Sequence, residues 1–135
     1  MTGDDLARAA AALVGTRFLL HGRDPATGLD CIGLLAAALA GAGRPVTLPN
    51  GYALRMRDPA GWLPEPAALG FAPARPSFLP GDAVLLRLGA IQLHLAIAAP
   101  GGGWIHAHAG LRRVVHQPVL PDGIILHHWR LAPCD

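Results

Sequence analysis

Cys31 is the residue whose type and position are best suited to covalent chemistry. It follows Asp30 and begins an apolar run to Ala40 that is typical of a buried helix. At a helix N-terminus, backbone N–H groups favour a thiolate and can also stabilise the oxyanion formed when an amide carbonyl is attacked. We therefore predict a lowered pKa for the Cys31 thiol and a nucleophilic role. Position alone also allows a small apolar residue packed in a helix.

Two histidines are the candidates for a base and its partner. Residues 93–98 alternate, which places His94 on one face of a strand, and His106 and His108 share a face of the next strand. If 99–101 is a three-residue turn, His94 lies directly opposite His106, close enough for one imidazole to bond the other. The pattern predicts His94 as general base and His106 as the residue that orients it. Ordinary strand histidines are the alternative.

Two helices are expected to position the thiol. Thr2 and Asp5 resemble a capping box before a first helix, which Gly15 ends. A polar loop, 21–28, follows. Asp30 is then the expected cap of a second helix, Cys31–Ala40, which is apolar on nearly all sides and should be buried.

The middle of the chain, 44–80, is rich in proline. Eight prolines exclude a long helix or a central strand there. We expect an irregular segment that walls a substrate cleft, with a helical turn at 52–57. The prolines are Pro45, Pro49, Pro59, Pro64, Pro66, Pro73, Pro76 and Pro80.

From Gly81 onward the apolar period changes to two. Successive short strands are predicted, separated by glycine or proline turns, at 82–88, 93–98, 102–109, 113–116 and 124–131. Helices followed by an antiparallel meander indicate an α+β fold.

Composition limits the classes of function. The chain has 135 residues, of which 52% are hydrophobic and 15% charged, and it is expected to form one domain, 1–135. Its eleven cations are all arginines and are scattered, so we expect no nucleic-acid partner. The two cysteines do not make a disulfide framework. No signal peptide or membrane span is evident, so we expect synthesis in the cytoplasm, no membrane partner, and delivery by other means if the protein acts outside.

Three ordered blocks of sequence resemble the NlpC/P60 family of cysteine peptidases. The resemblance implies a papain-like core of N-terminal helices on an antiparallel sheet, and cleavage of peptidoglycan stem peptides, usually between D-glutamate and the diamino acid. By position it implies the roles of Cys31 as nucleophile, His94 as base and His106 as the orienting residue. The blocks are Gly15–Phe18 with His21–Gly22 and Gly28–Leu34, then Gly81–Val84 with His94–Ile97, then Trp104–Ala107.

Within the family, the chain is most similar to phage-type enzymes, including tail peptidases of phages and gene transfer agents. That implies action in the periplasm as part of a particle, with tail proteins as partners. The chain departs from the family pattern at Phe18, where a tyrosine is common, and at Ile32, where a serine is common. These departures leave open a structural tail component without turnover. We expect substrate contacts from Phe18, His21, Asp30 and His108.

No cofactor or metal is expected. The alternative is a zinc site built from Cys31, His94 and either His106 or His108, because thiolate and imidazole ligands suit zinc. The sequence lacks the close ligand spacings of zinc fingers or of metalloprotease helices, which argues against that alternative.

Overall fold

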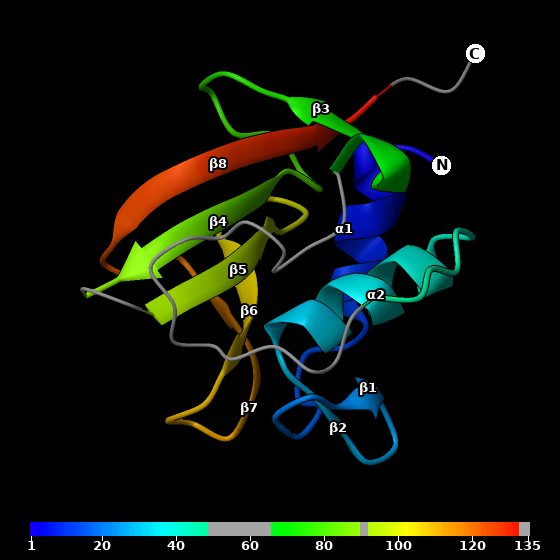
Figure 1. The fold of residues 1–135 in the computed structure, drawn as a ribbon, viewed down its shortest axis with the longest axis vertical. Coiled ribbons are helices and arrows are strands. Elements are labelled where there is room, and N and C mark those ends of the chain that lie inside the picture. The colour runs from blue at the N-terminus through cyan, green and yellow to red at the C-terminus, as the bar shows by residue number, and fades with distance from the viewer. Residues whose placement is uncertain (49–65, 90–91, 133–135) are drawn as a thin grey trace.

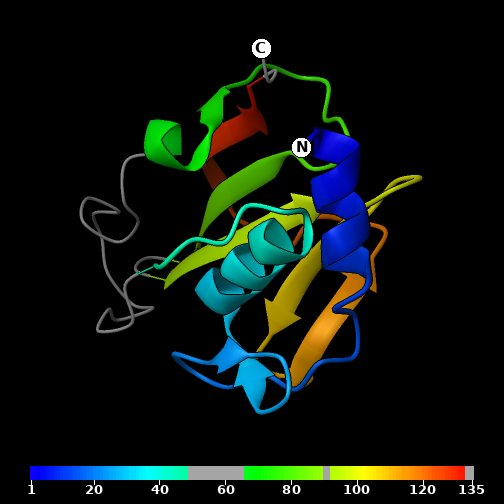
Figure 2. The same ribbon diagram turned by 90° about the vertical axis from the view of Figure 1, so that its right-hand side faces the viewer.

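The computed structural model describes residues 1–48, 66–89 and 92–132. Two α-helices pack on one face of a six-stranded antiparallel sheet (Figures 1 and 2), which confirms the α+β fold class. The helices are α1 (Gly3–Ala11), α2 (Cys31–Gly41) and the short 3₁₀ helix η1 (Pro66–Leu69). The strands are β1 (Arg23–Asp24), β2 (Gly28–Leu29), β3 (Phe71–Pro73), β4 (Ala83–Leu88), β5 (Gln92–Ala98), β6 (Trp104–His108), β7 (Arg113–Gln117) and β8 (Ile124–Leu131).

Both helices begin where the sequence predicts. At α1, the Thr2 hydroxyl accepts the Asp5 N–H at 3.2 Å and the Asp5 carboxylate accepts the Thr2 N–H at 2.9 Å. At α2, the Asp30 carboxylate accepts the Gly33 N–H at 2.8 Å. These caps satisfy N–H groups that have no partner within the helix. No helix within the described residues is long and apolar enough to cross a membrane.

Asp30 also ties α2 to the segment before it. Its carboxylate accepts the His21 backbone N–H at 2.8 Å and contacts the Arg23 guanidinium at 3.1 Å. The small hairpin of β1 and β2 begins within the predicted polar loop and ends one residue after it, and Asp30 itself is completely buried. One carboxylate therefore fixes both the first turn of α2 and the hairpin beside it.

The large sheet has the strand order β3-β8-β4-β5-β6-β7. The predicted strands are present, but the predicted simple meander is wrong because β8 returns to pair with β4. This pairing covers the edge of β4 that a meander would leave open. The sequence prediction also missed β3, which is the edge strand next to β8. It ends at Pro73, and proline is tolerated in an edge strand. The helical turn expected at 52–57 lies outside the described residues.

The register between β5 and β6 differs from the prediction. Ala98 pairs with Trp104, so the loop is the five residues 99–103, and the Ala99 N–H donates to the Gly103 carbonyl at 2.9 Å. Gly101, Gly102 and Gly103 all have positive φ, which lets the chain form this longer loop. A lengthening by two residues keeps His94 and His106 on the same face, although they are not directly opposite.

β5 and β6 pair only near this loop. The two paired positions are Ile97 with Ile105 and Ala98 with Trp104, and beyond them the strands diverge (Figure 1). Beyond that point β5 remains bonded to β4, and β6 to β7. A pocket lined by residues of both strands and by Cys31 at the start of α2 lies where the strands diverge.

A second buried carboxylate joins β4 to β8. Asp82 is completely buried, and it accepts hydrogen bonds from Arg130 at 2.9 Å and contacts His128 Nε2 at 2.6 Å. Burial alone would raise the pKa of Asp82, but hydrogen bonds from Arg130, the Leu79 N–H and His128 lower it overall. The folded state therefore holds this carboxylate ionised.

We expect Asp82→Asn to lower the free energy of unfolding by about 2–3 kcal/mol, because charge-assisted bonds to Arg130 and His128 are lost. The folded pKa lies below the unfolded value, so this contribution is present at neutral pH and is lost as the pH falls below about 4. Urea denaturation at pH 7 and pH 3 measures it, with exposed Asp122→Asn as control. Equal losses of stability at both pH values would contradict the assignment.

Candidate active site

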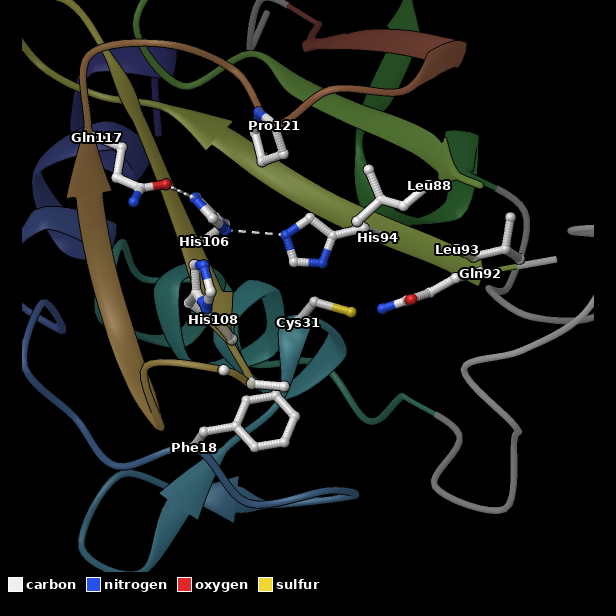
Figure 3. Close-up of a pocket in the computed structure, with 13 residues that line it drawn as sticks. Phe18, Cys31, Leu88, Gln92, Leu93, His94, His106, His108, Gln117 and Pro121 are labelled. Carbon is white, nitrogen blue, oxygen red and sulfur yellow. Dashed lines mark hydrogen bonds between the residues drawn. The ribbon is translucent and has the colours of Figure 1, made fainter. Parts of the chain in front are cut away.

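Cys31, His94 and His106 line one pocket, although they lie on α2, β5 and β6. The pocket has a volume of about 290 Å³ and opens where β5 and β6 diverge (Figure 3). The lining residues are Phe18, Cys31, Leu88, Gln92, Leu93, His94, His106, Ala107, His108, Ala109, Gly110, Gln117 and Pro121.

The Cys31 sulfur lies at the buried start of α2. The side chain is 3% exposed, and the sulfur points into the pocket beside the His94 ring in Figure 3. Backbone N–H groups of Leu95, Ile32 and Cys31 itself donate toward the sulfur and favour its thiolate. Leu95 lies on β5 beyond the last residue paired with β6. The end of that pairing therefore brings strand backbone and helix N-terminus to the same sulfur.

The predicted lowering of the Cys31 pKa is wrong. Burial, together with the charge of neighbouring Asp30, raises the pKa of the Cys31 thiol to about 12, against the favourable N–H groups. The helix N-terminus is present as expected, but the sequence could not reveal how completely the sulfur is desolvated. The resting thiol is therefore protonated at neutral pH, and attack requires a base.

His94 and His106 form the predicted pair through a diagonal contact. His94 Nε2 lies 2.9 Å from His106 Nδ1, and the rings meet edge to face at 87°. Burial, and then the neighbouring His106 and His108, lower the pKa of His94 to about 3. Burial also lowers the pKa of His106. Both imidazoles are neutral at pH 7, and Nδ1 is the His94 nitrogen that the contact with His106 leaves for the thiol.

Gln117 is a site residue that sequence reasoning missed. Its Oε1 lies 2.7 Å from His106 Nε2, so the row continues from β6 to β7. Register places Trp104 opposite Gln117 and His106 opposite Val115, which makes this contact diagonal as well. The predicted strand ended at His116, one residue short. In the sequence, alternation with Val115 is the only signal for the strand face on which Gln117 lies. That alternation does not identify the residue that Gln117 contacts.

Several solved structures have a fold similar to that of this chain. The chain is similar over 98% of its length to all of the NlpC/p60 domain of peptidoglycan hydrolase SagA, with a TM-score of 0.63 and 22% identity. The chain has the NlpC/P60 fold. It is also similar over 95% of its length to the peptidoglycan hydrolase RipB of Mycobacterium tuberculosis, covering 63% of that chain, with a TM-score of 0.59 and 21% identity.

A third solved structure has a similar fold. The structure of NlpC1 from Trichomonas vaginalis matches 94% of this chain with a TM-score of 0.62 and 17% identity, and this chain spans 44% of its length. No family model and no curated protein sequence matches the chain. The similarity to known proteins therefore lies in the fold.

Two of the four predicted substrate-binding residues lie at the pocket of this NlpC/P60 fold. Phe18 and His108 line it, and the His108 ring centroid lies 5.7 Å from that of His106. His21 and Asp30 do not line it. Asp30 is instead the buried cap of α2 and binds the His21 backbone, so its position explains the placement of Cys31 and not a substrate contact.

The described part of the chain offers no group of three histidine, cysteine, aspartate or glutamate side chains arranged to hold a metal ion. His106 uses both ring nitrogens, toward His94 and toward Gln117. An imidazole engaged in this way has no lone pair to offer a zinc ion. These two contacts disfavour the zinc alternative that uses His106, whereas they do not test the alternative that uses His108.

Because the Cys31 pKa is raised, its alkylation rate should keep rising above pH 9 in the folded protein. A free thiol, with a pKa near about 8.5, approaches its plateau there. Iodoacetamide rates from pH 6 to 10, read by peptide mapping, measure this, and the same cysteine in urea-unfolded protein is the reference. A plateau below pH 7 would instead indicate a preformed thiolate–imidazolium pair.

Proposed function

We propose that this protein is a cysteine peptidase that hydrolyses peptide amide bonds in bacterial peptidoglycan. The observation that carries the proposal is one pocket that holds a thiol at a helix N-terminus and a hydrogen-bonded histidine pair. The NlpC/P60 fold, found in the peptidoglycan hydrolases SagA and RipB, supports the substrate class.

The proposed reaction follows from the neutral resting pair. His94 Nδ1 takes the thiol proton as the Cys31 sulfur attacks the amide carbonyl, so the proton moves during the attack. N–H groups at the start of α2 stabilise the oxyanion. The tetrahedral intermediate collapses, the C–N bond breaks, and His94 returns the proton to the departing amine. Water then hydrolyses the thioester and restores the thiol.

We further propose the bond between D-glutamate and the diamino acid as the target, with delivery to the periplasm by a phage-like tail. The sequence resemblance to NlpC/P60 peptidases supports the target bond, and the resemblance to phage-type enzymes within that family supports the delivery. Ala107, Ala109 and Gly110, which line the pocket, have small side chains or none, and this suits a stem peptide lying extended beside Cys31.

A second candidate function is a tail component that binds the wall without cleaving it. Two observations favour it: Cys31 is 3% exposed, and Phe18 gives the pocket no hydroxyl. This protein would sediment with purified peptidoglycan and leave its muropeptides intact. The two candidates are separated by whether the parent protein releases new amines.

Cys31→Ala should abolish the release of new amines from purified peptidoglycan, because none of the other described residues that line the pocket carries a thiol or an aliphatic hydroxyl. Labelling of free amines, followed by chromatography of the products, measures this. Cys134→Ala is the matched control and should retain parental release. Equal release by the parent and Cys31→Ala would sink the peptidase proposal.

Phe18→Tyr should raise kcat/KM about 2- to 10-fold, the worth of one hydrogen bond made by a new hydroxyl at the pocket. The assay is initial-rate cleavage of soluble muropeptides. Phe78→Tyr is the control, because Phe78 packs against Trp104 and His128 away from the pocket. An unchanged kcat/KM for Phe18→Tyr would mean that the missing hydroxyl does not limit this site.

A further inference from the structure

A single row of hydrogen-bonding side chains crosses three strands beside the pocket. It runs from His94 on β5 through His106 on β6 to Gln117 on β7 (Figure 3). His94 Nε2 lies 2.9 Å from His106 Nδ1, and His106 Nε2 lies 2.7 Å from Gln117 Oε1. His106 is 1% exposed, so water has little access to the middle of the row.

The chemistry of these atoms fixes where the protons lie. An amide oxygen only accepts, so His106 Nε2 must carry a proton and donate it to Gln117 Oε1. A neutral imidazole has one donor and one acceptor, so His106 Nδ1 is then an acceptor. His94 Nε2 must donate to it, which leaves His94 Nδ1 without a proton. The lowered pKa values of both histidines keep the rings neutral, as this reasoning requires.

We propose that Gln117 is a positioning residue that sets the tautomer of His106 and, through it, the tautomer of His94. Its consequence for catalysis rests on the proposed function, since a base needs a bare Nδ1 to take the thiol proton. If the row were reversed, His94 Nδ1 would carry a proton and could not act as the base. A general base held in the wrong tautomer can lose about 10⁴-fold in rate.

The direct test is the protonation of the ring nitrogens in the full chain without substrate. Long-range ¹H–¹⁵N correlation spectra at pH 7 should show both His94 and His106 protonated at Nε2. Gln117→Met keeps the length of the side chain and removes the acceptor, so both rings should become mixtures of tautomers. A parent His94 protonated at Nδ1, or unchanged tautomers in Gln117→Met, would overturn the proposal.

Gln92→Met is the matched control for the spectra. Gln92 lines the same pocket and is the other glutamine of the chain, but no contact joins it to the histidine row among the described hydrogen bonds. The same substitution there should leave the Nε2–H tautomers of His94 and His106 in place. Loss of those tautomers in Gln92→Met would show that the effect does not depend on the Gln117 acceptor.

Kinetics add a readout that a purely structural role would not move. Gln117→Met should lower kcat at least tenfold with little change in KM. Gln117→Glu keeps an acceptor and should retain kcat within about threefold of the parent, while its negative charge raises the pKa of the histidine pair and shifts the acidic limb of the rate profile to higher pH. Equal loss of kcat in both variants would contradict the proposal.

The spectra and the cleavage assay test two different proposals, and a negative result in one does not decide the other. The tautomers are read without substrate, so a parent protein that releases no amines defeats the peptidase proposal while the protonation of the row is still decided. A parent that cleaves peptidoglycan but carries its proton on His94 Nδ1 defeats the role of Gln117 alone.

Discussion

The buried carboxylate of Asp30 is the interaction on which the site depends. It caps α2 through the Gly33 N–H and holds the His21 backbone and the Arg23 guanidinium, so it fixes where the Cys31 sulfur lies. The same charge lies beside the thiol and, after burial, is the second cause of its raised pKa. The carboxylate that positions the Cys31 sulfur thus opposes its ionisation at rest. The proposed reaction must therefore rely on a base that acts during the attack.

The sheet places a candidate base, His94, next to the Cys31 thiol. β5 and β6 separate beyond Ile97 and Ile105, and α2 begins beside the gap, so a helix N-terminus and a strand histidine meet at one pocket. His94 is almost as buried as Cys31, and its lowered pKa keeps it neutral. A buried neutral thiol next to a buried neutral imidazole avoids the desolvation cost of a resting ion pair. In the proposed reaction, charge develops only during the attack, beside N–H groups already in place.

Local sequence patterns predicted most of the fold and part of the arrangement of the site. The caps at Thr2 and Asp30 and the alternation after Gly81 correctly predicted the starts of α1 and α2 and the strands β4 to β8, because capping and side-chain period are decided by neighbours in sequence. The return of β8 to β4 was missed. That pairing joins residues more than thirty positions apart, and no turn between them specifies it.

The sequence by itself determined the start of the Cys31 helix and the shared face of His94 and His106, since a strand's parity survives a loop lengthened by two residues. Only the tertiary structure decided the diagonal register, the contact of His106 with Gln117, and the burial that reverses the expected shift of the Cys31 pKa. The physical reason is the range of each effect. Capping and alternation act within a few residues, whereas register and desolvation depend on every element that packs around the group.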